Sequence, residues 1–325
     1  MYEIVITGAD EGRRLDKFLF AYLNTAPHSL VYKLLRKKRI KLNGKRARGN
    51  ELLQNGGIIT LHISNENLKS CRGVAEPTKT SSQTALDIVY EDADLLIINK
   101  PAGIPSHGGM KSKDVHLLSQ ALSYLRQTDA YPPDATFTPA LCNRLDVNTS
   151  GLVICGKNYQ AIRAANTLLA TPGSIDKEYL AVVEGELLGS KTLEGYYKKD
   201  TTANIAHIAQ NGEGLPVITK YKSLAAAKDY TLVSINPITG RSHQIRAHMA
   251  AIGHPLAGDK KYGGKPVKYL TSQLLHCRRL TIAAPSALPY PIGTTWEAAP
   301  PEKFTTLGLV PTNDNGQLSR QLFAN

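Results

Sequence analysis

The feature that most constrains the fold of this chain is an interruption in its hydrophobic pattern. Residues 65–84 are rich in Ser, Thr, Lys and Asn and show neither helical nor strand periodicity, so we predict a linker there. A chain of 325 residues also exceeds the size at which one hydrophobic core usually stops growing. We therefore predict a small domain at 1–64 and a larger domain at 85–325.

The positive charge of the chain is concentrated before this linker. Lys and Arg number 39 against 27 acidic residues, a net charge of +12, and residues 1–64 hold 12 basic and 5 acidic residues, or +7 of that excess. Such a surplus favours a nucleic-acid partner. From Lys33 to Arg48 nine of sixteen residues are basic and none is acidic, which is also compatible with an ordinary solvated helix face. We expect RNA contacts from eight of them: Lys33, Arg36, Lys37, Lys38, Arg39, Lys41, Lys45 and Arg46.

The small N-terminal domain has the pattern of two helices followed by a hairpin. Apolar residues at 15, 18, 19, 22 and 23 predict an amphipathic helix. A second helix is expected to be capped by Ser29 and to end in the basic run. Asn43-Gly44 then predicts a tight turn between two strands.

Strand patterns dominate the region after the linker. Successive strands with short turns and few helices predict an α+β domain whose mixed sheet is mainly antiparallel and flanked by helices. The predicted helices cover 115–126 and a segment capped by Asn158. The predicted strands are 86–90, 95–99, 152–155, 179–184, 203–209, 217–225 and 230–235.

The composition also bears on the compartment of the protein. Four scattered cysteines without a C-x-x-C pair suit a reducing cytoplasm. No apolar run approaches the length of roughly 20 residues that spans a bilayer, and the N-terminus has no hydrophobic signal core, so we expect neither a membrane partner nor a targeting sequence.

Two segments carry residues suited to chemistry, although neither is decisive alone. Residues 143–158 place Arg144 and Asp146 before a turn and a buried strand, where a surface ion pair is the ordinary alternative. Residues 238–264 contain a short helix with Ser242 as the expected N-cap, and several Arg and His residues crowd its start. A phosphate-binding helix start is the simpler interpretation, and the His spacing does not favour a metal site.

The order of six motifs resembles the RluA family of pseudouridine synthases, in particular its RluC and RluD type. The motifs are LLIINKPAG at 95–103, NRLDVNTSGL at 143–152, KEYLAVVEG at 177–185, ITGRSHQIRAH at 238–248, GHPLAGDKKY at 253–262 and, more weakly, the segment from Leu275 to Leu280. Residues 14–46 are similar to the small RNA-binding domain named after ribosomal protein S-four. One departure is visible, because Asn143 stands where the family usually has His.

The resemblance implies roles for individual residues. It makes Asp146 the essential carboxylate, Tyr179 the ring that stacks on the target base and Arg246 the charge partner of the carboxylate. Residues of these motifs are expected to bind substrate: Asn143, Arg144, Thr149, Arg241 and His243. Three lysines at motif edges are candidates for phosphate contacts or for simple solvation: Lys100, Lys157 and Lys177. The reaction needs no metal and no cofactor.

The implied activity is isomerisation of uridines in a structured RNA, most simply large-subunit ribosomal RNA or a ribosome assembly intermediate. Transfer RNA is the alternative substrate. A non-catalytic RNA-binding or ribosome-assembly factor would be expected to lack Asp146, Tyr179 or Arg246, and all three are present. A glycosidase with paired carboxylates is disfavoured because the Asp146 motif has no second acid. We expect a monomer.

Overall fold

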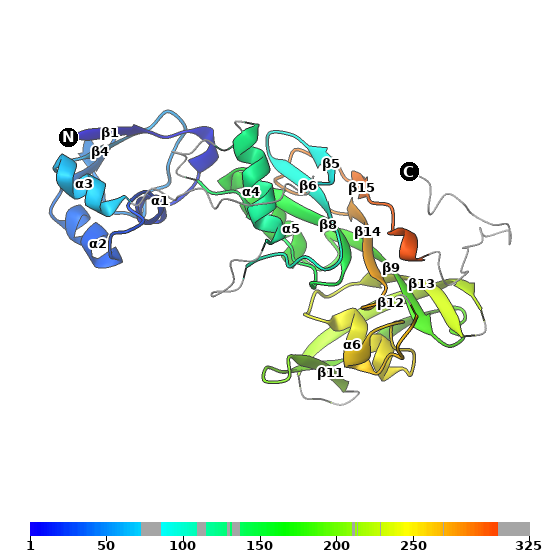
Figure 1. The fold of residues 1–325 in the computed structure, drawn as a ribbon. Coiled ribbons are helices and arrows are strands. Elements are labelled where there is room, and N and C mark those ends of the chain that lie inside the picture. The colour runs from blue at the N-terminus through cyan, green and yellow to red at the C-terminus, as the bar shows by residue number, and fades with distance from the viewer. Residues whose placement is uncertain are drawn as a thin grey trace.

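The chain forms two separate β-sheets, each with its own buried core (Figure 1). The computed structural model describes residues 1–72, 86–108, 115–128, 131, 137–209, 212, 214–227, 229–268 and 270–304. Within these residues no helix has the length and apolar character needed to cross a membrane.

The N-terminal sheet is antiparallel with the strand order β1-β4-β2-β3. Its elements are β1 (Tyr2–Val5), η1 (Gly8–Asp10), α1 (Leu15–Tyr22), α2 (His28–Arg36), β2 (Ile40–Leu42), β3 (Lys45–Arg46) and β4 (Ile58–Leu61). The predicted apolar stripe of α1 is confirmed, since Leu15, Phe18 and Leu19 are fully buried. The predicted tight turn is confirmed as well, with Asn43 and Gly44 at φ 50° and 74°.

Two predictions for this region are wrong. Pro27, in extended conformation, is the N-cap of α2 in place of Ser29, and no side chain caps this helix. A third helix, α3 (Asn65–Cys71), occupies the start of the segment expected to be an unstructured linker. Leu68 and Cys71, three residues apart, are buried in the N-terminal core. These two side chains therefore attach the otherwise polar helix α3 to that core. Residues 73–85 of the expected linker lie outside the described residues.

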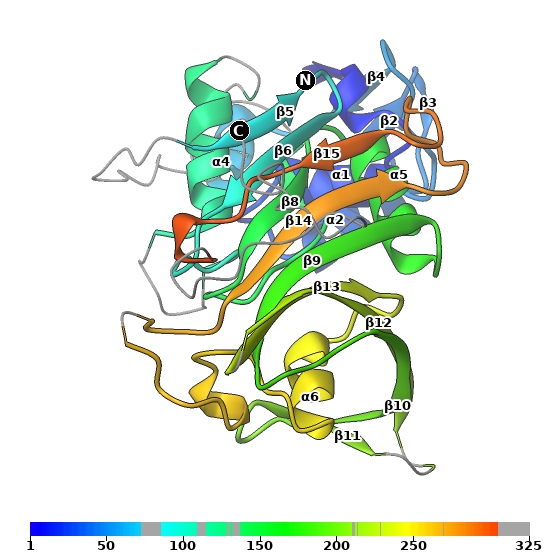
Figure 2. The same cartoon turned by 90° about the vertical axis from the view of Figure 1, so that its right-hand side faces the viewer.

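The second sheet is large and mainly antiparallel, as predicted. Its strand order is β11-β10-β12-β13-β9-β14-β8-β6-β5, with β7 beside β8 and β15 beside β14 (Figure 2). The strands are β5 (Ile88–Glu91), β6 (Leu95–Lys100), β7 (Ala140–Leu141), β8 (Ser150–Gly156), β9 (Ile175–Glu184), β10 (Ser190–Asp200), β11 (Ile205–Ala209), β12 (Leu215–Ala226), β13 (Tyr230–Pro237), β14 (Leu275–Ile282) and β15 (Thr295–Glu297). Strand β10 was not predicted, because only Leu193 and Tyr197 of its residues are buried.

Helices cover the two ends of this sheet. Helices α4 (Leu117–Gln127) and α5 (Tyr159–Ala170) share a core with β6 and β8, and α6 (Gln244–Ala251) packs against β9 and β13. The predicted cap of α5 is confirmed, since the Asn158 side chain accepts a hydrogen bond from the Ala161 amide at 2.8 Å. The described residues also form two short 3-10 turns, η2 (Lys260–Tyr262) and η3 (Glu302–Phe304).

One close contact in the middle of the sheet fixes the position of the loop before β8. Strands β8 and β14 are the parallel pair of the described sheet, and Gly151 of β8 has φ 112°. A Cβ atom at this position would lie 2.2 Å from the Cys277 carbonyl oxygen, so only glycine allows this approach. Because β14 also pairs with β9, the end of the 143–149 loop is brought beside the middle of β9.

Candidate active site

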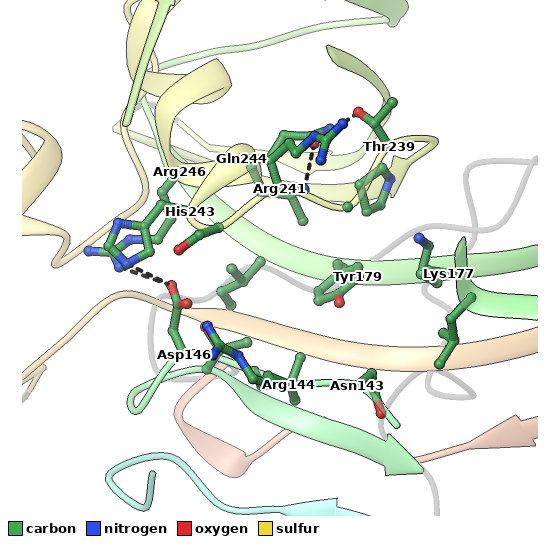
Figure 3. Close-up of a pocket in the computed structure, with 18 of the residues that line it drawn as sticks. Asn143, Arg144, Asp146, Lys177, Tyr179, Thr239, Arg241, His243, Gln244 and Arg246 are labelled. Carbon is green, nitrogen blue, oxygen red and sulfur yellow. Dashed lines mark hydrogen bonds and ion pairs between the residues drawn. The ribbon is translucent and has the colours of Figure 1, made fainter. Parts of the chain in front are cut away.

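Three segments that are far apart in sequence enclose one cavity of about 380 Å³. The first is the loop before β8 with Asp146, the second is β9 with Lys177 and Tyr179, and the third is the turn at 239–243 with the start of α6 (Figure 3). Both predicted chemical segments therefore meet at a single site.

A buried arginine joins two carboxylates at this site. Arg246 on α6 is 7% exposed and donates from Nη1 to Asp146 Oδ2 at 3.0 Å. Its Nε and Nη2 atoms donate to the two oxygens of Asp259 at 2.7 and 2.8 Å. Asp259 is 2% exposed, whereas the Asp146 side chain is 28% exposed. Asp146 is thus the carboxylate that a ligand in the cavity can reach.

The charge of Arg246 is maintained by these partners. Burial acts to lower the pKa of Arg246, but the hydrogen bonds and charge of Asp259, together with Asp146, outweigh it and raise the pKa. The guanidinium also lies over the Tyr262 ring, 4.9 Å from its centroid.

His243 lies against the same carboxylate. Its Nδ1 shares a hydrogen bond of 2.9 Å with the Tyr262 hydroxyl, and its Nε2 is 3.6 Å from Asp146 Oδ2. Burial lowers the pKa of His243, although the nearby Asp146 acts to raise it. His243 is the N-cap of α6 in left-handed conformation, so the predicted cap Ser242 is wrong. The Gln244 side chain instead accepts a hydrogen bond from the Arg241 amide and closes the turn.

Tyr179 stands on the opposite wall from Arg246 (Figure 3). It pairs in register with Cys277 of β14. Burial, followed by the neighbouring Cys277 thiol, raises the pKa of Tyr179 well above its ordinary value, so its phenol is protonated at neutral pH. Lys177, two residues earlier on the same face, also lines the cavity, and burial lowers its pKa.

The loop that carries Asp146 is braced by its neighbours. Asn143 accepts a hydrogen bond from the Ile154 amide at 2.7 Å and donates to the Leu152 carbonyl, so its side chain ties the loop to β8. The Ser106 hydroxyl contacts both the amide and the carbonyl of Leu145. Thr149 is 2% exposed, and its Oγ1 has no hydrogen-bond partner within the described chain.

Comparison with known proteins assigns this arrangement to a family. Residues 94–251 match the family described as RNA pseudouridylate synthase. Ribosomal large subunit pseudouridine synthase C of Vibrio parahaemolyticus is 33% identical over 288 residues, which cover 88% of this chain and 87% of the relative. The protein of the same name from Escherichia coli K12 is 31% identical over 270 residues, covering 81% and 80%.

The chain belongs to the RluA family of RNA pseudouridine synthases. Solved structures show the same fold. The human protein RNA Pseudouridylate Synthase Domain Containing 4 aligns with 67% of this chain and 90% of its own, with 21% identity and a TM-score of 0.53. The human Domain Containing 1 protein aligns with 73% and 100%, with 24% identity and a TM-score of 0.50. The protein is therefore an isomerase that acts on uridine in RNA.

Several residues of the synthase differ from what the sequence suggested. Lys100 is fully buried and cannot contact phosphate, since its Nζ donates to the carbonyls of Pro101, Ile104 and Val147 at 2.8 to 3.0 Å. Lys157 is paired with Glu91 at 2.7 Å. Both lysines were expected at the surface, because nothing in the sequence around a charged residue at the edge of a motif indicates that its side chain is buried.

Other residues of the motifs lie at the rim of the cavity or away from it. Arg144 and Arg241 are exposed and line the cavity, as does Thr239. His248 instead points to β12, where its Nδ1 contacts the Thr219 hydroxyl at 2.7 Å, so it does not join the site. Among the described residues, no three His, Cys, Asp or Glu side chains lie together as a metal site requires.

Sequence reasoning missed Asp259, Tyr262 and Cys277 as parts of the site. Asp259 and Tyr262 lie within the quoted motif at 253–262, but a role needs a partner, and their partners are on α6 and the 239–243 turn. Cys277 lies within the weak sixth motif, and its proximity to Tyr179 depends on strand register.

The buried Lys100 makes a prediction about pH. Burial lowers its pKa to about 8, so above this pH the unfolded chain binds more protons than the folded chain, and the stability rises up to the ordinary pKa. Between pH 8 and 10.5 we expect the unfolding free energy of the wild type to rise by about 2 to 3 kcal/mol relative to that of Lys100→Met. Urea unfolding followed by fluorescence of Trp296, the single tryptophan, measures it. Parallel pH curves for the two proteins would contradict the assignment.

Proposed function

We propose that this synthase converts uridines to pseudouridine in large-subunit ribosomal RNA and that Asp146 is its catalytic carboxylate. The observation that carries the proposal is the placement of Asp146: it is paired with buried Arg246 and remains accessible in a cavity that also presents Tyr179. The ribosomal substrate is supported by the names of the relatives at 31 to 33% identity.

The chemistry explains why these groups are needed. The bond between uracil N1 and the ribose C1′ must break, the base must turn, and C1′ must join to C5, whose proton is then released. Asp146 supplies an ionised carboxylate that either attacks C1′ or removes the 2′ proton to give a glycal. In both routes Arg246, fixed by Asp259, keeps the carboxylate oriented.

Tyr179 is proposed to hold the detached base. A ring on the wall facing Asp146 offers a stacking surface for the detached uracil. Burial raises the pKa of its phenol, so the hydroxyl is protonated and can donate a hydrogen bond to the base.

The target nucleotide has to leave its stacked position to reach Asp146, at a cost of a few kcal/mol. Arg144 is exposed beside the catalytic loop and forms no hydrogen bond or ion pair within the described residues, so it is free to fill the vacated space or to bind the adjacent phosphate. Thr149, Arg241 and His243 are proposed to contact the nucleotide from the cavity wall. Asn143 is proposed to act indirectly, by holding the loop.

Residues 1–64 are proposed to form an S-four-like RNA-binding domain. Helix α3 packs against the core of this domain. Seven of the eight predicted RNA-binding side chains are exposed and Lys41 is half-buried. Within the described chain, none of the eight is engaged in an ion pair. We further propose that the protein acts as a monomer in the cytoplasm, with transfer RNA as the alternative substrate.

Removing the charge of Asp146 tests the catalytic role. Asp146→Asn should abolish isomerisation and leave RNA affinity within a few-fold, because the amide keeps the size of the side chain but is neither nucleophile nor base. Pseudouridine mapping of total RNA from cells that carry the wild type, the variant or no gene measures both substrate and activity. Retained pseudouridine in the variant would refute the role of Asp146, and loss of sites confined to transfer RNA would refute the ribosomal substrate.

The basic face of α2 is tested by its salt dependence. Replacing Lys33, Arg36 and Lys37 together by Gln should flatten the log-log salt slope of RNA binding by about 2, since each lost phosphate contact contributes roughly 0.7 to 0.9. Exchanging Lys for Arg and Arg for Lys at the same positions keeps the charge and is the control. Equal slopes for the Gln variant and the wild type would show that these residues form only a solvated surface.

A further inference from the structure

We propose that a second cavity beside Asp146 binds the phosphodiester backbone of the RNA strand next to the target uridine. The inference deepens the proposed function, because it concerns the same substrate and the same carboxylate. It depends on the geometry, charge and lining of this second cavity, which has a volume of about 500 Å³.

The two cavities meet at Asp146. They share Arg144, Leu145, Asp146, Ser242, His243 and Arg246, and then extend in different directions. The first continues to Tyr179 and Lys177, whereas the second continues to the end of β10 and to η2. A nucleotide with its sugar at Asp146 and its base on Tyr179 therefore has the second cavity available for its phosphates.

Unpaired positive charge surrounds the second cavity. Lys199 of β10 and Lys260 and Lys261 of η2 line it together with Arg144, and all four side chains are exposed. Within the described residues, none of the four forms an ion pair or a hydrogen bond through its side chain. Both acidic residues of the lining, Asp146 and Asp259, are already bound by Arg246. The cavity thus has an excess of cations with no anion of the protein to neutralise it.

The other residues that line the second cavity are suited to bind the sugar-phosphate backbone of RNA rather than a base. Amide and hydroxyl groups come from Asn148, Asn204, Ser242, Thr271 and Gln273. Among the described residues the cavity has no Tyr, Phe or Trp ring, and its two imidazoles are those of His107 and His243. Bases are commonly held by stacking, whereas phosphate and ribose are held by Lys, Arg, Ser, Asn and Gln side chains. The chemistry of the second cavity therefore matches phosphate and sugar, and the stacking residue belongs to the first cavity.

The test uses the full-length protein and a short oligoribonucleotide that contains a mapped target uridine. The double variant with Lys199→Gln and Lys261→Gln should flatten the log-log salt slope of binding by about 1.4, at roughly 0.7 per contact on a single strand. Over a rise from about 50 to 200 mM salt, the wild type should then lose about sevenfold more affinity than the variant. The single-turnover rate at saturating RNA should stay within a few-fold of the wild type.

Two controls separate local contacts from general charge. The double variant with Lys191→Gln and Lys220→Gln removes the same charge from exposed positions on β10 and β12 outside both cavities, and it should keep the wild-type slope. Replacing the phosphates that flank the uridine by neutral methylphosphonates should abolish the difference between the wild type and the Lys199 and Lys261 variant.

The proposal would be overturned if both double variants flattened the slope equally, or if the methylphosphonate RNA preserved the difference. An unchanged slope in the Lys199 and Lys261 variant would also overturn it. The oligonucleotide is taken from whichever RNA the wild type modifies in cells. A substrate other than ribosomal RNA would therefore refute the proposed function and leave this test valid.

Discussion

The site depends on one buried guanidinium held between two carboxylates. A charge that is 7% exposed must be compensated, and Asp259 does so through two hydrogen bonds from a fully buried position. Only Nη1 of Arg246 then remains for Asp146, at 3.0 Å. Asp259 fixes the position of Arg246, and Arg246 fixes the orientation of Asp146, which is the solvent-accessible carboxylate of the two.

The backbone around Asp146 is also fixed by contacts with neighbouring segments. Lys100 binds the carbonyl of Val147, the residue after Asp146, and Gly151 permits the close approach of β8 to β14. The Ser106 hydroxyl holds Leu145, the residue before Asp146, so the loop is anchored at both sides of the reactive residue. Catalysis benefits from groups that need no reorganisation. The two cavities that meet at this residue give separate places for a base and for a charged backbone.

The sequence was informative where the pattern that determines a feature lies within one continuous segment. Periodicity located α1, the capping residue Asn158 located the start of α5, and the ordered motifs identified the residues around Asp146, Tyr179 and Arg246. It failed where the outcome depends on a distant partner. The burial of Lys100 needs three carbonyls from two loops, the start of α6 is held by the Gln244 side chain, which donates to the Ile218 carbonyl of β12, and β10 is stabilised by its neighbours β11 and β12 despite its polar sequence.

The most direct measurement is the single-turnover rate of Asp259→Asn at saturating RNA, together with the dissociation constant of the same RNA. The amide cannot balance the Arg246 charge, so the arginine should hold Asp146 less firmly. The account predicts a rate at least tenfold lower, which corresponds to about 1.4 kcal/mol, in a protein that is folded by circular dichroism and binds RNA within a few-fold of the wild type. A folded variant with the wild-type rate would contradict it.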